Sequence, residues 1–317
     1  MHAPYSRNAD QRDALDSTRD AGYGSRWRGR RLARGCGALA VLVGALTACS
    51  SKPVLVPDKT TVAAAAPSAA GSTTVMALPG SLAWDFTNDL KPSLAGKVGL
   101  AVMPVGTDRV LALGDWSSGP GWSTMKVPLT LAALRKSSGN QVAAVNAIEY
   151  SDNSAADTLW QSLGTPEAAA QTVQDVLREG GDTETTVPAT RARADYSAFG
   201  QAEWSLANQL KFAAKLPCLA QSDDVTSLMG KISSTQRWGL GNLDGAIFKG
   251  GWGPDPSGNY LVRQFGLIPV DGGQIAIAVA TQPNSGSFDD GTTILTKIAT
   301  LIGKHLDELK GGTCTAG

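Results

Sequence analysis

Apolar residues recur at intervals of three and four along most of the segment 123–239, which is the spacing of one face of a helix. Glycine, proline and small polar residues interrupt this segment at several points. We therefore expect five helices in it, near residues 123–137, 141–150, 153–163, 166–181 and 204–216. Outside the segment the pattern changes, and short runs rich in apolar residues predict strands at 97–105, 108–116, 245–252, 259–270 and 273–282.

Helical spacing of apolar side chains returns before the first predicted strand and after the last, at residues 82–94 and 291–309. The order is therefore helix, hairpin, helical block, three strands and helix. It predicts an α/β (α+β) fold in which terminal helices flank an antiparallel sheet and a helical subdomain is inserted. We place the domain at 81–312, with a sheet subdomain of 81–122 plus 240–312 and a helical subdomain of 123–239.

The N-terminal segment has the pattern of an export signal. A run of Arg precedes the apolar stretch Cys36–Ala48, which is too short to span a bilayer. We assign residues 1–49 to a leader with a signal peptide. The Ala-, Ser-, Thr- and Pro-rich segment 50–80 cannot build a core and is predicted to be a disordered tether.

The end of the leader resembles the lipobox of bacterial lipoproteins, in which the cysteine becomes the first mature residue and carries lipid. Here the matching residues are Leu46, Thr47, Ala48 and Cys49. This resemblance implies an exported lipoprotein that is held at the cell membrane through Cys49 and faces the cell wall. The pair Arg30–Arg31 leaves general secretion and twin-Arg export both open.

Composition is that of ordinary globular material, with 42% hydrophobic and 18% charged residues. The net charge is zero, but the leader holds eight Arg and four Asp, so the remaining residues have a small acidic excess. Nucleic acid is therefore not an expected partner, and we expect a monomer. Two cysteines lie beyond the leader, Cys218 and Cys314, and they form either a disulfide or two unrelated thiols.

Only two histidines exist, His2 in the leader and His305 near the C-terminus, where we expect a solvated helix residue. A Ser-His-Asp triad needs a placed imidazole, and a catalytic zinc site usually needs two or three. The sequence therefore predicts no metal and no organic cofactor. Any nucleophile must be activated by another group.

Ser123 and Lys126 are the first candidates for nucleophile and base. They follow a Gly-Pro-Gly break and stand three residues apart, so they share a face at the start of a helix. The Ser123 N–H there has no intrahelical partner and can bind a developing oxyanion. A partly buried Lys can take the hydroxyl proton. The alternative is a helix-capping Ser beside a solvated Lys.

Two further short motifs carry candidate chemistry. Ser151-Asp152-Asn153 precedes a predicted helix, so it is either a helix cap or a proton carrier, Ser151, followed by a substrate-binding amide, Asn153. Lys249 ends a strand-like run and Gly250-Gly251 follow, where glycines let a backbone approach a ligand. An extended substrate could pair with this edge as an added strand.

In this order, the three motifs resemble the signature set of the serine β-lactamases and penicillin-binding proteins. The resemblance covers about residues 80–310 and is closest to class A β-lactamase-like proteins of the actinobacterial lipoprotein type. It implies acyl transfer through Ser123, on β-lactams or on D-Ala-D-Ala peptides of the peptidoglycan stem. It implies that Ser123 is the nucleophile, with Lys126 as its base or base partner and Ser151 as the proton carrier. Lys249 would bind the substrate carboxylate and set the field around Ser151. The remaining implied substrate contacts are Asn153 for an amide, the Trp252 N–H after Gly251 for the oxyanion together with the Ser123 N–H, and Arg263, which is either a second carboxylate ligand or a surface residue.

Three departures from that family affect the expected function. The nucleophile and the Ser-Asp-Asn motif are only 28 residues apart, about half the class A separation. Gly250 replaces the Thr of Lys-Thr-Gly. The segment 185–204 lacks the deacylating Glu and has only Asp195 and Glu203 as carboxylates. We therefore expect acylation without rapid β-lactam turnover, and the alternative is a catalytically degenerate module that binds peptidoglycan or a partner.

Overall fold

The computed structural model describes residues 80–314. The predicted leader, the lipidated Cys49 and nearly all of the tether lie outside this part of the chain. The described chain forms one antiparallel sheet of five strands in the order β2-β1-β5-β4-β3. The strands are β1 Gly96–Pro104, β2 Leu111–Gly114, β3 Ile247–Pro254, β4 Tyr260–Val270 and β5 Gly273–Pro283.

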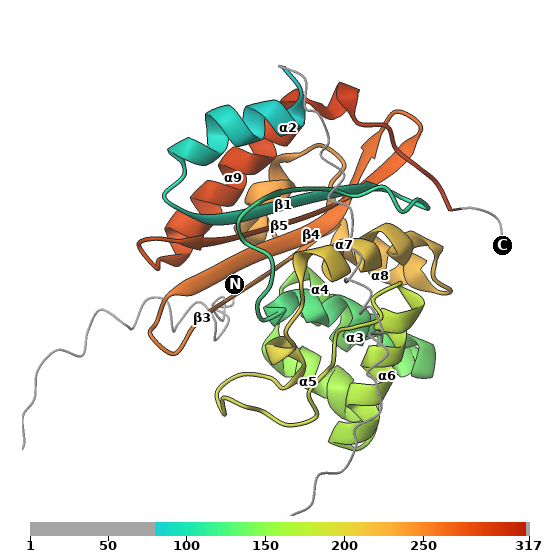
Figure 1. Ribbon diagram of the computed structural model, residues 1–317. Helices are drawn as coiled ribbons and strands as arrows, with labels where there is room; N and C mark the ends of the chain where they lie inside the picture. The colour runs from blue at the N-terminus through green and yellow to red at the C-terminus, as the bar shows by residue number, and fades with distance from the viewer. Residues whose placement is uncertain (1–79, 315–317) are drawn as a thin grey trace, which may run out of the picture. The chain divides into compact units, whose positions relative to one another are not determined.

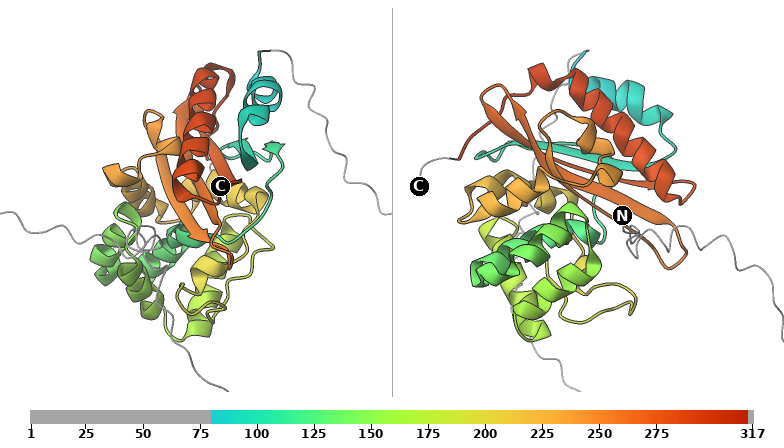
Figure 2. Two further views of the ribbon diagram at one scale, coloured as in Figure 1. Left: turned by 90° about the vertical axis from the view of Figure 1, so that its left-hand side faces the viewer. Right: turned by 180° about the vertical axis from the view of Figure 1, so that it is seen from behind.

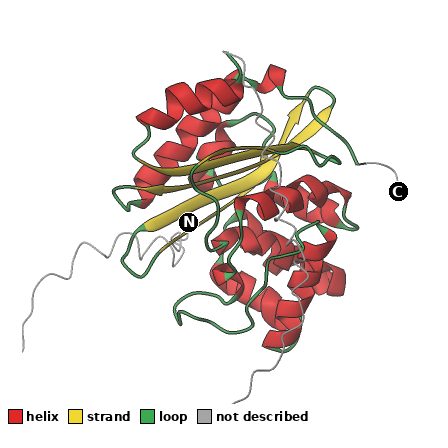
Figure 3. Ribbon diagram, in the orientation of Figure 1, coloured by secondary structure: helices red, strands yellow, loops and turns green. Residues whose placement is uncertain are grey.

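The three central strands are buried almost without interruption, because helices cover both faces of the sheet (Figures 1 and 3). Strand β3 lies at one edge and pairs only with β4 in the described sheet, with Gly251 opposite Arg263 and Trp252 opposite Val262. This edge strand carries the predicted Lys-Gly-Gly motif.

The terminal helices share one face of the sheet, as Figure 2 shows from behind. Helix α2 (Leu82–Asp85) continues into a π-helical turn, η1 (Phe86–Leu90), and packs beside α9 (Phe288–Lys304). The expectation of a solvated His305 is wrong. His305 is only 6% exposed, and its two ring nitrogens lie 3.0 Å from Asp85 Oδ2 and 2.5 Å from Glu308 Oε1.

Between β2 and β3 the chain is helical, and α7 packs against the other face of the sheet (Figure 1). The predicted fold class is therefore confirmed. One helix, α8, was missed because its eight residues are too few for a periodic signal. The α-helices of this block are α3 Lys126–Lys136, α4 Gln141–Glu149, α5 Asn153–Ser162, α6 Pro166–Glu179, α7 Leu206–Lys215 and α8 Ser222–Met229. Short 3₁₀ turns are η2 Lys91–Ser93, η3 Trp122–Met125, η4 Ser138–Asn140, η5 Phe199–Gln201, η6 Leu216–Cys218, η7 Ser234–Gln236, η8 Gly239–Asn242 and η9 Leu306–Glu308.

Cys218 and Cys314 form a disulfide whose Cα atoms lie 5.4 Å apart, so one of the two alternatives for these cysteines is confirmed. The bond ties the end of the described chain to the turn between α7 and α8. No helix within residues 80–314 combines the length and apolar character needed to cross a bilayer.

Candidate active site

Ser123 lies in the 3₁₀ turn η3, immediately before α3 begins at Lys126. A 3₁₀ helix has three residues per turn, so side chains at positions 123 and 126 lie one above the other. Trp122, just before the serine, has φ of +48°, which is left-handed backbone for a bulky residue. Such a conformation costs about 1–3 kcal/mol and is found preferentially at functional sites. The turn is therefore a candidate nucleophile turn, and we use this name for residues 119–123.

Lys126 joins the nucleophile turn to the Ser-Asp-Asn motif. Its side chain is buried, and its Nζ donates to the Ser151 carbonyl oxygen at 2.5 Å, to Asn153 Oδ1 at 2.7 Å and to Ser151 Oγ at 3.3 Å. The alternative of a solvated lysine is therefore wrong. The structure brings together two segments that the sequence separates by 25 residues.

The three residues of the Ser-Asp-Asn motif have different roles. Asp152 caps α5, because its Oδ1 accepts a hydrogen bond from the Ala155 N–H at 2.6 Å. Because Asp152 alone caps the helix, the side chains of Ser151 and Asn153 are not used for capping, and both contact Lys126. Ser151 has φ of +58°, a second strained residue in the same site.

Lys249, in β3, brings the third motif to the same hydroxyl. It is completely buried, and its Nζ donates to Ser151 Oγ at 2.8 Å and to the Gly250 carbonyl oxygen at 2.9 Å. Two lysine amines, from α3 and from the sheet edge, thus contact one buried hydroxyl. At 2.8 Å, Lys249 is within direct proton-transfer distance of Ser151 Oγ, whereas Lys126, at 3.3 Å, must approach slightly.

The two residues after Lys249 are glycines for different physical reasons. A Cβ at Gly251 would lie 2.7 Å from the Thr124 nitrogen and 2.9 Å from the Ser123 nitrogen, so only glycine lets β3 approach the nucleophile turn. A Cβ at Gly250 would lie 3.2 Å from the ring of Trp238 on the other face of the strand. Trp238 therefore occupies the space that the threonine of Lys-Thr-Gly would need.

Trp252 directs its side chain away from the nucleophile, since its ring packs on Trp238 and Phe288. The prediction for Trp252 concerned its backbone N–H, and it stays a prediction. Asn153 is exposed although its side-chain oxygen accepts from Lys126, which leaves the residue accessible to a ligand.

Arg263 requires a correction, because the structure does not make it a substrate ligand. Its side chain is fully buried, and its guanidinium donates to the carbonyl oxygens of Gly119, Pro120 and Trp204 and to Gln209 Oε1, at 2.9–3.1 Å. Burial lowers its pKa to about 9, and the Glu203 carboxylate opposes this shift. Arg263 is therefore an internal clamp that holds the nucleophile turn to the segment before α7.

Gln209, which was not among the predicted site residues, completes this clamp. Its Nε2 donates to Thr124 Oγ1 at 2.9 Å, while its Oε1 accepts from Arg263. The residues on both sides of Ser123 are thus held by two buried side chains, Arg263 and Gln209, which are hydrogen-bonded to each other. No local pattern reveals this, because a buried Gln in an amphipathic helix does not differ from an exposed one by sequence.

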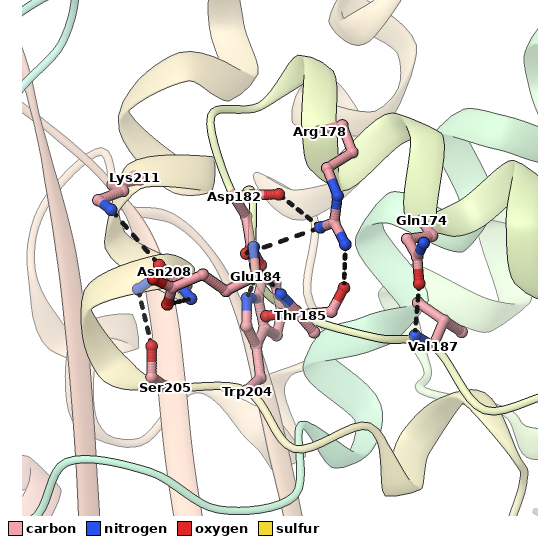
Figure 4. A network of polar contacts seen from close by, with 10 residues as sticks. All are labelled: Gln174, Arg178, Asp182, Glu184, Thr185, Val187, Trp204, Ser205, Asn208 and Lys211. Atoms are coloured by element: carbon pink, nitrogen blue, oxygen red, sulfur yellow. Dashed lines mark hydrogen bonds and ion pairs between the residues drawn. The ribbon is translucent and has the colours of Figure 1, made fainter. Parts of the chain in front are cut away.

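A second polar network anchors the long loop between α6 and α7 (Figure 4). The buried Asp182 accepts from the backbone N–H groups of Glu184 and Thr185 at 3.1 and 3.0 Å, and from Trp204 Nε1 at 2.9 Å. Arg178 donates to the carbonyl oxygens of Asp182 and Thr185 from the end of α6. Because the Trp204 carbonyl oxygen accepts from Arg263, the loop anchor and the clamp meet at one residue.

The two carboxylates expected in this loop, Asp195 and Glu203, are both exposed. Glu203 Oε1 accepts a hydrogen bond from Ser118 Oγ at 2.6 Å. Neither carboxylate forms a hydrogen bond with Ser123. In residues 80–314, no group of three or more His, Cys, Asp or Glu side chains is placed to hold a metal ion.

Comparison with solved structures shows which fold this is. No protein-family model and no curated protein matches the sequence. The structure is similar to a class A β-lactamase from Bacteroides cellulosilyticus (TM-score 0.59, 16% identity, 72% of this chain and 99% of that one). It is also similar to the TLA-3 extended-spectrum β-lactamase (0.58, 18%, 71% and 98%) and to the chromosome-encoded β-lactamase of Vibrio parahaemolyticus (0.57, 16%, 72% and 100%).

Proposed function

We propose that this chain, whose fold is that of the class A β-lactamases, is a serine acyl-transfer enzyme that acts through an acyl-Ser123 intermediate. The observation that carries the proposal is the convergence of Lys126 and Lys249 on Ser151 Oγ, at 3.3 and 2.8 Å. The glycine-dependent contact of β3 with the Ser123 nitrogen adds to it. A structural role alone would not bring two buried amines to one hydroxyl, because burying like charges together is costly.

The acylation step follows from the positions of these groups. Two buried ammonium groups so close repel each other, which favours the neutral amine at one of them, and we assign that amine to Lys126. Its two N–H groups would then serve the two shorter contacts, to the Ser151 carbonyl oxygen and Asn153 Oδ1, so that the nitrogen lone pair can accept a proton. Lys126 accepts the Ser123 hydroxyl proton as Oγ bonds to the substrate carbonyl carbon. The carbon–nitrogen bond then breaks, and Ser151 hands a proton to the leaving nitrogen while Lys126 resupplies it.

Substrate binding is assigned to the remaining predicted residues. The N–H groups of Ser123 and Trp252 would bind the oxyanion, since Gly251 sets β3 directly against the nucleophile turn. Lys249 would bind a substrate carboxylate, and Asn153 a substrate amide. The substrates of this proposal are β-lactams and D-Ala-D-Ala peptides.

Deacylation is proposed to be slow. The loop carboxylates Asp195 and Glu203 are exposed, and Glu203 is hydrogen-bonded to Ser118. Neither of these two carboxylates is hydrogen-bonded to Ser123, which supports slow activation of a water beside the acyl-serine.

The test is incubation with a fluorescent penicillin, followed by intact-protein mass spectrometry over several hours. We expect one covalent adduct that persists, that Ser123→Ala abolishes, and that Ser154→Ala, an exposed serine at the start of α5, retains. Absence of an adduct at high penicillin concentration would favour the alternative, a binding module that keeps the fold without catalysis. Rapid loss of the adduct with turnover would contradict the slow deacylation.

Export and lipid attachment at Cys49 form a further part of the proposal, and they rest on the sequence alone. The proposed protein would be a monomer at the cell membrane that faces the cell wall. Cys49→Ser is expected to move the protein from the membrane fraction to the soluble fraction of the producing cell. Unchanged fractionation would contradict the anchor.

A further inference from the structure

A second cation lies beyond the nucleophile along β3. Arg193, in the loop between α6 and α7, donates from Nη1 to the carbonyl oxygen of Pro254, the last residue of β3. Its guanidinium lies over the Tyr196 ring, 4.3 Å from the ring centroid. Tyr196 in turn contacts the ring of Trp122 edge-on, with centroids 5.1 Å apart. Arg193 is thus connected to the nucleophile turn through two aromatic rings.

The position of Arg193 along the strand can be stated from the register. A Cβ at Gly251 would lie 2.9 Å from the Ser123 nitrogen, and Pro254 stands three residues further on, which is about 10 Å in a strand. Lys249 stands two residues before Gly251, in the opposite direction along β3 from Pro254. The candidate nucleophile therefore lies between two cationic ends of the same sheet edge.

The charge of Arg193 has no ionic partner among residues 80–314. Its neighbour Asp195 is exposed and does not reach it, and Asp255 accepts instead from the N–H groups of Ser257 and Asn259. Arg191, in the same loop, differs because it pairs with Asp157 at 3.4 Å. A half-buried guanidinium that is held by a ring and a carbonyl, yet keeps donors unused, is prepared to bind an anion.

We propose that Arg193 binds a carboxylate on the acyl side of the substrate, about three strand residues from the bond that reacts. This inference rests on the proposed acyl transfer at Ser123 and adds a substrate class to it: extended acyl donors that carry an acidic group at their far end. A donor paired with β3 would place one carboxylate at Lys249 and the second at Arg193.

Two probes that differ in one group test the proposal. The first is 6-aminopenicillanic acid acylated with hexanedioic acid, which ends in a carboxylate, and the second is its terminal carboxamide. The measurement is the rate at which each forms the Ser123 adduct, as a ratio of acid to amide. For the wild type we expect a ratio of about ten, because only the acid can form a charge-assisted hydrogen bond with Arg193. High salt should reduce the ratio.

Arg193→Gln should bring the ratio to about one, and Arg193→Lys should keep part of it. Arg191→Gln is the matched control and should keep the full ratio. A wild-type ratio of one, or a ratio that Arg193→Gln leaves intact, would overturn the assignment. If neither probe acylates the protein, acyl transfer at Ser123 is refuted, and calorimetric binding of the two probes decides the anion site. Tighter binding of the acid that Arg193→Gln abolishes would support it, and equal binding would overturn it.

Discussion

Replacing Arg263 with methionine distinguishes an internal clamp from a substrate ligand. The change removes the donors of three buried hydrogen bonds and of one part-buried hydrogen bond, to the Pro120 carbonyl oxygen. The Gly119 carbonyl oxygen keeps a partner, the Trp204 N–H, so three acceptors lose their donor: the buried Trp204 carbonyl oxygen and Gln209 Oε1, and the part-buried Pro120 carbonyl oxygen. At about 1 kcal/mol for each orphaned acceptor, Arg263→Met should cost roughly 3 kcal/mol of unfolding free energy.

A loss of this size lowers the melting temperature of a domain of this length by roughly 6–12 °C. A further contribution comes from the rings of Trp116 and Trp204, which lie 5.1 and 5.9 Å from the guanidinium carbon. Removal of the buried positive charge also removes its desolvation cost, and this gain opposes the losses. A carboxylate ligand at the surface would instead change stability by less than about 0.5 kcal/mol.

The assay is thermal unfolding by circular dichroism, together with the penicillin acylation rate measured well below the melting transition. Arg237→Met is the control, because Arg237 is half-buried and its guanidinium makes one described hydrogen bond, to the Gly241 carbonyl oxygen at 3.2 Å. The melting temperature of Arg263→Lys should lie between those of the wild type and Arg263→Met, because an ammonium cannot reproduce the planar set of donors of a guanidinium. If Arg263→Met melts like the wild type and only weakens binding of carboxylate-bearing donors, the clamp is refuted.

Three further outcomes are expected. Gly251→Ala should reduce the rate of penicillin acylation by at least about a hundredfold, because the new Cβ would press on backbone atoms of the nucleophile turn. The control is Gly303→Ala in α9, which should be acylated like the wild type, because the Cβ there meets only the end of a leucine side chain. Cys314→Ser should lower the unfolding free energy by about 2–4 kcal/mol in denaturant titrations, and an unchanged midpoint would contradict a stabilising disulfide. Burial opposes protonation of His305, but its two carboxylate partners raise its pKa above 6.5. The stability that it contributes is therefore full below pH 6.5 and is lost as the pH rises through the raised value; His305→Gln should flatten this dependence in unfolding titrations.

Much of the fold follows from local patterns. The spacing of apolar residues over 123–239 predicts helices because burial on one helical face needs that period, and five of them are present. The short runs rich in apolar residues became the strands of one antiparallel sheet. Helix α8 was missed since eight residues cover barely two turns. The expected last helix, 291–309, ends at Lys304, where His305 leaves helical geometry to reach its carboxylate partners.

Some residues of the site were predicted from the sequence, and others were identified only in the structure. Ser-x-x-Lys, Ser-Asp-Asn and Lys-Gly-Gly were recognised as short motifs, and the structure brings Lys126, Ser151 and Lys249 together. Which side of a strand faces the substrate is not encoded in a motif. Arg263 was therefore misassigned as a possible ligand, and Arg193 was not considered at all.

The sequence by itself determined most of the elements, their order and the three motifs, because periodicity, turn residues and motif spacing act over a few residues. Only the tertiary structure decided the environment of each charged group. The partners of Arg263 come from positions up to 144 residues away, and His305 is bound by a residue 220 positions earlier. Burial and hydrogen bonding depend on such distant contacts, so the same arginine or histidine letter can stand for a ligand, a clamp or a solvated side chain.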